Sequence, residues 1–99
     1  MRKIKELVEE IGEELDGAKG YAERYVEFKA AGDSNWSGRF KQMANDELTH
    51  ASYLHDLVVA EIEKYRRVMT VPDGMQEKWD TEHKKYVEKA AWVKQMLTL

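Results

Sequence analysis

Ala31-Gly32-Asp33-Ser34-Asn35 is the stretch that divides an otherwise helix-forming sequence. Glycine often follows the last residue of a helix, because it adopts a left-handed backbone conformation without a steric penalty. Asp, Ser and Asn, which come next, are the residues that cap helix N-termini. The stretch therefore predicts the end of one helix and the start of a second, joined as an antiparallel hairpin.

A second break lies at residues 70–74, where Pro72 and Gly74 fall close together. The two breaks divide a single domain of 99 residues into segments of about 2–31, 35–69 and 75–99. Each segment repeats apolar residues three or four positions apart, which is the period of a helix with one buried side. We therefore expect an all-α fold, in which a helical hairpin is followed by a third helix.

The composition excludes several classes of function. The chain carries 16 basic and 19 acidic residues, a net charge of -3, with no basic block that would attract nucleic acid. It has no cysteine, no apolar run of about 20 residues that could span a bilayer, and no apolar core of a signal peptide near its start. These features predict a cytoplasmic protein that binds neither nucleic acid nor membranes.

Acidic residues interrupt the apolar sides of the first two segments. Glu47 lies in the middle of the apolar side of segment 35–69, and His50 lies on the same side, about 60° away around the helix. Glu14 borders the apolar side of the first segment. An ionised carboxylate buried without a partner is very costly, and no Lys or Arg interrupts the stripes beside these residues.

A metal ion is one way to compensate these carboxylates. A Glu and a His three residues apart on a helix can reach the same ion. Mixed carboxylate and imidazole ligands suit iron or manganese, and zinc also accepts them. A second reading remains open, in which Glu47 and His50 pair with each other or with a partner chain. The protein would then be a non-catalytic helical oligomerisation or adaptor module, with or without a structural metal.

The metal reading implies a dimer, because one chain holds only half of a known type of site. Di-iron carboxylate bundles take a Glu from each of two helices and a Glu-x-x-His from each of the other two. This chain supplies one helix of each type, and a two-fold axis would provide Glu14, Glu47 and His50 twice. A short chain with a modest core also favours a homodimer or higher homo-oligomer.

Three features carry a resemblance to the ferritin-like superfamily: Glu14, Tyr21 seven residues later, and the run Glu47-Leu48-Thr49-His50-Ala51. Rubrerythrins show a similar Glu-x₆-Tyr followed by Glu-x-x-His-Ala. The short chains of encapsulated ferritins are also similar, since they form one hairpin and dimerise across a ferroxidase centre. The resemblance covers roughly residues 7–65.

This resemblance implies a ferritin-like four-helix bundle completed by dimerisation, with two iron ions per dimer. It implies a ferroxidase-type oxidoreductase that oxidises Fe(II) with dioxygen or peroxide. Glu14, Glu47 and His50 would be the catalytic metal ligands, and Tyr21 would lie next to them. The chain ends in an apparent helix without the separable tag of encapsulated ferritins, so an encapsulin shell is not an expected partner.

Three further polar residues have simpler interpretations. His55 lies at the edge of the apolar stripe and is interpreted as a packing residue. Glu61 is too far along the helix to share a metal with His50, and a Lys or Arg of another helix would pair with it. His83 is interpreted as a hydrogen-bonded core histidine, with a second metal site as the alternative.

Overall fold

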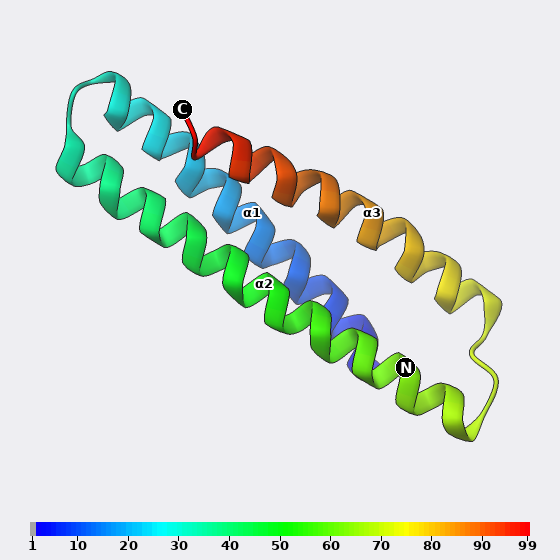
Figure 1. Ribbon diagram of the computed structural model, residues 1–99. Helices are drawn as coiled ribbons and strands as arrows, with labels where there is room; N and C mark the ends of the chain where they lie inside the picture. Colours follow the sequence, from blue (N-terminus) through cyan, green and yellow to red (C-terminus); the bar gives the residue numbers. More distant parts are fainter. Residues whose placement is uncertain (1) are drawn as a thin grey trace.

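The computed structural model describes residues 2–99, which form three long helices and no strand. Helix α1 spans Arg2–Ala30, α2 spans Ser34–Val68 and α3 spans Asp73–Met96. Helices α1 and α2 form an antiparallel hairpin, and α3 runs back along it to give a rod of 56 × 17 × 17 Å (Figure 1). The all-α, three-helix prediction is confirmed, and each helix boundary lies within three residues of the predicted one.

The hairpin turn uses the residues that the sequence indicated. Gly32 has a positive φ of 77°, the conformation in which a side chain would be strained. The amide of Asp33 donates back to the carbonyl of Phe28 at 2.9 Å, which closes the end of α1. The Asp33 carboxylate then accepts from the amide of Trp36 at 3.0 Å and caps α2. Because Asp33 is the cap, α2 starts at Ser34, one residue earlier than predicted.

The core forms two clusters along the seam between α1 and α2, and α3 contributes to both. One cluster brings Trp79 of α3 against aliphatic residues of the hairpin, and the other brings Val93 against small and aromatic ones. Small residues dominate the middle of the seam, where Ala18, Ala22 and Ala44 are fully buried. The two long helices can therefore approach closely beside the predicted metal ligands.

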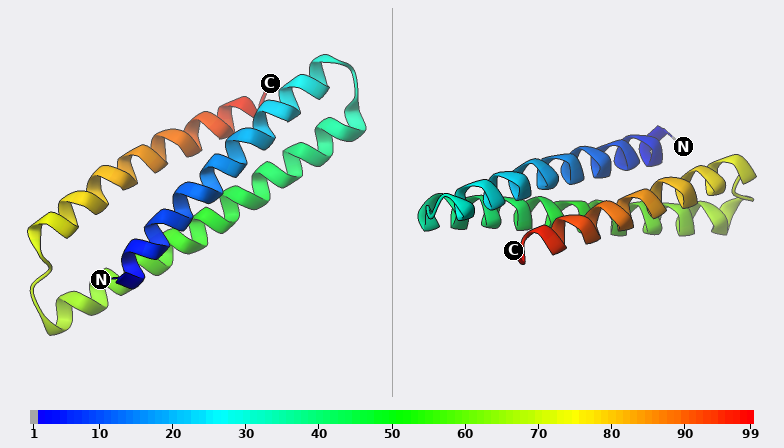
Figure 2. Two further views of the ribbon diagram at one scale, coloured as in Figure 1. Left: turned by 180° about the vertical axis from the view of Figure 1, so that it is seen from behind. Right: turned by 90° about the horizontal axis from the view of Figure 1, so that it is seen from above.

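Helix α3 covers only one side of the hairpin (Figure 2). The Tyr86 hydroxyl donates to the carbonyl of Val8 at 2.8 Å, and Lys89 forms an ion pair with Asp16, so α3 is joined to α1 at two levels. Within residues 2–99, no helix covers the opposite side of the hairpin. In that part of the chain no helix is both long and apolar enough to cross a membrane.

We expect the seam to depend on close packing at Val58, which is fully buried, and not at Val59, which is 40% exposed. Val58→Ala removes apolar contacts and leaves a cavity, and should lower the free energy of unfolding by about 2 kcal/mol. Val59→Ala, the same change one residue away, should stay within about 0.5 kcal/mol. Urea unfolding followed by circular dichroism measures both, and equal losses would contradict this arrangement of α2.

Candidate metal centre

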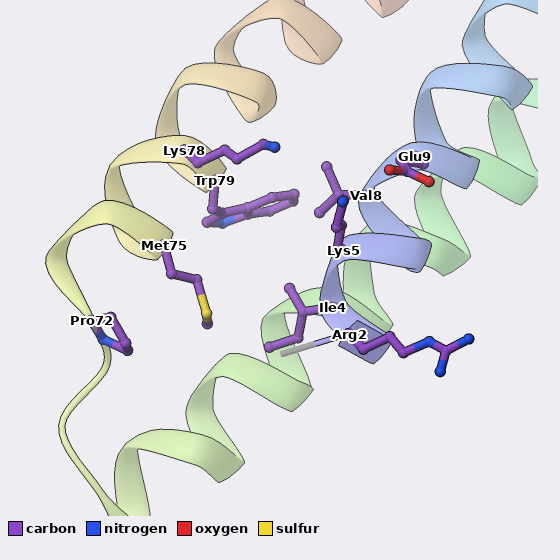
Figure 3. Close-up of a pocket in the computed structure, with 9 residues that line it drawn as sticks. All are labelled: Arg2, Ile4, Lys5, Val8, Glu9, Pro72, Met75, Lys78 and Trp79. Atoms are coloured by element: carbon purple, nitrogen blue, oxygen red, sulfur yellow. The ribbon is translucent and has the colours of Figure 1, made fainter.

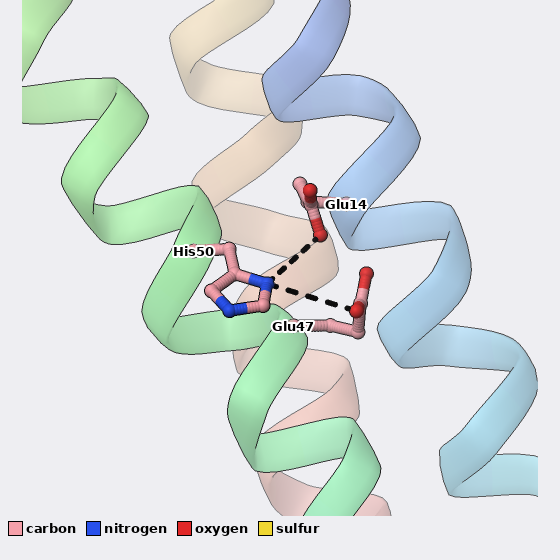
Figure 4. Close-up of side chains that lie close together, drawn as sticks. All are labelled: Glu14, Glu47 and His50. Carbon is pink, nitrogen blue, oxygen red and sulfur yellow. Dashed lines mark ion pairs between the residues drawn. The ribbon is translucent and has the colours of Figure 1, made fainter.

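Glu14 of α1 meets Glu47 and His50 of α2 on the open side of the hairpin (Figure 4). The Nδ1 atom of His50 lies 3.4 Å from a Glu14 carboxylate oxygen and 3.7 Å from one of Glu47. One potential ligand atom of each residue lies within 4.8 Å of the other two. Atoms bound to one metal at about 2.1 Å are roughly 3–4 Å apart, so small side-chain adjustments would make this set a metal site.

The hairpin itself brings these three residues together. Glu14 lies about four helical turns before the end of α1 at Ala30, and Glu47 lies about four turns after the start of α2 at Ser34, so antiparallel pairing places them opposite each other. His50 follows Glu47 by three residues, which directs both side chains to one side of α2. Residues 2–99 contain no other group of three His, Cys, Asp or Glu side chains with this spacing.

The carboxyl group of Glu14 changes the pKa of the neighbouring Glu47. A hydrogen bond with the Glu14 carboxyl raises the pKa of Glu47 above its usual range. Partial burial and the negative charge of Glu14 raise this pKa further, and His50 lowers it. The ionised form of Glu47 is therefore less favourable here than in water. A divalent cation held between the two carboxylates would compensate both negative charges.

Gly17 makes room for the Glu47 carboxylate. A Cβ atom at this position would lie 2.9 Å from Glu47 Oε2, well inside normal contact distance. The sequence signal for this role is a glycine three residues after Glu14, on the same side of α1. The structure shows that the approaching group is the carboxylate of a candidate ligand.

The candidate ligands are less deeply buried than the stripe pattern suggested. The side chains of Glu14 and Glu47 are 29% and 25% exposed, and that of His50 is 53% exposed. Their side of the seam is the one that α3 leaves open. The set therefore lies at the border between core and solvent, and further ligand atoms could reach it from outside the chain.

Tyr21 is placed on the same hairpin, with its ring against Phe40 at a centroid distance of 6.1 Å. Within residues 2–99, its hydroxyl forms no hydrogen bond with any of the three candidate ligands. Its role beside a metal stays a prediction. Glu61 pairs with Lys3 of α1 at 3.4 Å, as the sequence indicated for a carboxylate too distant for the site.

His55 and His83 lie together on the other side of α2, away from the candidate ligands. Their ring centroids are 5.0 Å apart, and the ring of Trp79 lies 5.8 Å from His55 and 5.1 Å from His83. The three rings form a contact between α2 and α3. This arrangement favours the packing interpretation of His55. Within residues 2–99 His83 is half-buried and forms no hydrogen bond, so it is held by ring contacts and not by the hydrogen bond expected of a core histidine.

No known family model, curated protein or solved structure matches the chain. The ferritin-like resemblance therefore stays a prediction from the motif residues in the sequence.

Gly17→Ala should weaken metal binding without lowering the stability of the protein. Alanine favours the interior of a helix by about 1 kcal/mol over glycine, so the metal-free variant should be as stable as the parent or more so. Its Cβ would displace the Glu47 carboxylate and weaken the binding of Fe(II) or Mn(II) roughly 10- to 100-fold. Gly20→Ala is the matched control, because a Cβ at Gly20 meets nothing within 4 Å. Calorimetric titration measures the affinities, and equal binding by the two variants would exclude this role for Gly17.

Glu47→Gln should stabilise the metal-free protein at neutral pH. The folded-state pKa of Glu47 is raised above its ordinary value of 4.5, so this carboxyl favours folding below that value and loses the effect as pH rises through the raised pKa. Glutamine avoids this loss while keeping the shape of the side chain. We expect the melting temperature of the variant to exceed that of the parent at pH 7, and the difference to shrink towards pH 4. Glu13→Gln, an exposed neighbour of Glu14, should show no such pattern.

Proposed function

We propose that the chain binds a first-row transition metal through Glu14, Glu47 and His50, and that two chains pair to complete a ferritin-like di-iron centre. This centre would oxidise Fe(II) with dioxygen or peroxide. The observation that carries the proposal is the convergence of the three side chains from two helices, with ligand atoms within 4.8 Å of one another. The spacing of Glu47 and His50 in the sequence follows from the helix alone. Their meeting with Glu14 depends in addition on how α1 and α2 pair.

The number of donor atoms supports pairing of two chains. Two carboxylates and one imidazole leave a metal such as iron short of its usual coordination number. A second copy related by a two-fold axis would raise the set to four carboxylates and two imidazoles for two ions. That set is the one found in di-iron carboxylate bundles.

The surface around the candidate ligands also supports a second copy. Met43 and Leu57 lie seven residues on either side of His50, on the same line along α2, and they are 39% and 52% exposed. Trp36 extends this line by another seven residues and is 51% exposed. A seven-residue repeat of apolar side chains is typical of a seam between two helices. A second hairpin on this face would bury the repeat and exclude water from the ligands.

The chain's own groups would supply charge and proton transfer. Fe(II) is the substrate and gives one electron per ion; dioxygen takes two electrons and two protons to form hydrogen peroxide, or peroxide takes two of each to form water. The carboxylates of Glu14 and Glu47 would favour the more highly charged Fe(III) product. Because metal ligands must be deprotonated and the pKa of Glu47 is raised, Fe(II) binding would become tighter as the pH rises. His50 would hold the ion with a neutral ring nitrogen.

Iron loading tests this proposal directly. The protein loaded with Fe(II) without oxygen should sediment as a dimer with about two iron ions, as in other di-iron bundles. After oxygen is admitted, Fe(III) absorbance should rise faster than in buffer alone. The double variant Glu47→Ala/His50→Ala should lose both the iron and the faster oxidation, whereas Glu13→Ala should keep them.

Other results would favour the other readings. A parent protein that stays metal-free, with Fe(II) oxidation at the buffer rate, would point to an oligomerisation or adaptor module. Stoichiometric zinc without oxygen consumption in the presence of Fe(II) would point to a structural metal.

A further inference from the structure

A separate pocket of about 410 Å³ lies between the start of α1 and the start of α3 (Figure 3). Its apolar wall consists of side chains from both helices and from the turn before α3: Ile4, Val8, Pro72, Met75 and Trp79. Pockets that hold small molecules in proteins are commonly 300–1,000 Å³ and mostly apolar. The pocket therefore has the size and character to hold one small apolar group.

Core residues hold this wall in place. Ile4, Val8 and Trp79 are each less than a tenth exposed and belong to the core cluster of the hairpin. Met75 extends from the first turns of α3 toward Ile4, and its unbranched thioether adapts to irregular apolar shapes. Because the wall belongs to the packed core, it cannot collapse without moving α3. The part of a ligand inside it must be apolar.

The edge of the pocket is positively charged. Lys5 projects from α1, and Lys78 of α3 extends over the indole of Trp79 toward α1 (Figure 3). The ion pairs that lysines form within residues 2–99 use Lys3, Lys85 and Lys89, so Lys5 and Lys78 lack a carboxylate partner there.

Two other charged residues line the pocket and do not cancel this charge. Arg2 is paired with Glu6 at 3.1 Å, and its guanidinium group points away from Trp79. Glu9 contributes one negative charge to the lining against the two lysines. The edge thus keeps an excess of positive charge above an apolar interior.

We propose that this pocket binds a small amphiphilic anion, an unbranched acyl chain with a carboxylate head. The chain would lie against Trp79 and Met75 between α1 and α3, and the carboxylate would lie between the ammonium groups of Lys5 and Lys78. The Glu14–Glu47–His50 cluster takes no residue from α3, so this site is independent of the proposed metal chemistry.

Titration with decanoate, kept below the concentration at which it forms micelles, tests the proposal. Decanol and decyltrimethylammonium serve as probes with the same chain and a neutral or positive head. Decanoate should bind at a single saturable site and at least about tenfold more tightly than decyltrimethylammonium at low salt. In NMR spectra the indole N–H signal of Trp79 should shift, and those of Trp36 and Trp92 should not.

The variant Lys5→Glu/Lys78→Glu should reverse the preference between the two charged probes. The control Arg39→Glu/Lys84→Glu makes the same change in net charge away from the pocket and should keep the preference for decanoate. The proposal fails if decanoate binds without saturation or only as micelles, or if the three probes bind equally. It fails too if the control variant loses as much affinity for decanoate as the Lys5→Glu/Lys78→Glu variant does. It also fails if decanoate shifts the indole N–H signal of Trp36 or Trp92 and leaves that of Trp79 unchanged.

Discussion

The candidate site depends on two carboxyl groups that the hairpin forces into the same place. Glu14 and Glu47 come from facing helices, and their carboxylates meet at the border of the seam. A hydrogen bond with Glu14, partial burial and the negative charge of Glu14 raise the pKa of Glu47, and a cation held between the two carboxylates would compensate both charges. His50 adds a nitrogen donor from the turn that follows Glu47. This one constraint explains why three ordinary polar side chains form a candidate set of metal ligands.

Much of the fold could be predicted from local sequence signals. Gly32 and Pro72 mark the two breaks, and the apolar period of each segment indicates three helices. The turn chemistry at Gly32 and Asp33 agrees with that reading. The position of α3 was harder to predict, since only Trp79 and Val93 of that helix are buried within it. A helix with so few buried residues carries little pattern to show which neighbour it packs against.

The candidate site was partly predictable for a related reason. The spacing of Glu47 and His50 and the position of Glu14 could be read along each helix separately. The function of Gly17 could not, because the contact it permits is made across the hairpin and depends on the distance between helices. The exposure of His50 also required the structure, since it follows from which side of the hairpin α3 covers. The pocket beside Trp79 likewise depends on how α3 packs against the start of α1.

The placement of Glu14 and Glu47 on opposite arms of the hairpin has a consequence for how the chain unfolds. A cation held by both would tie two points far apart in the sequence into one closed loop, as a disulfide does in other small proteins. This chain has no cysteine to serve that purpose. Such a tie would be reversible, because it would form and break with the supply of metal. Resistance to proteolysis would then rise and fall with metal availability, and the fold would report the metal status of its surroundings.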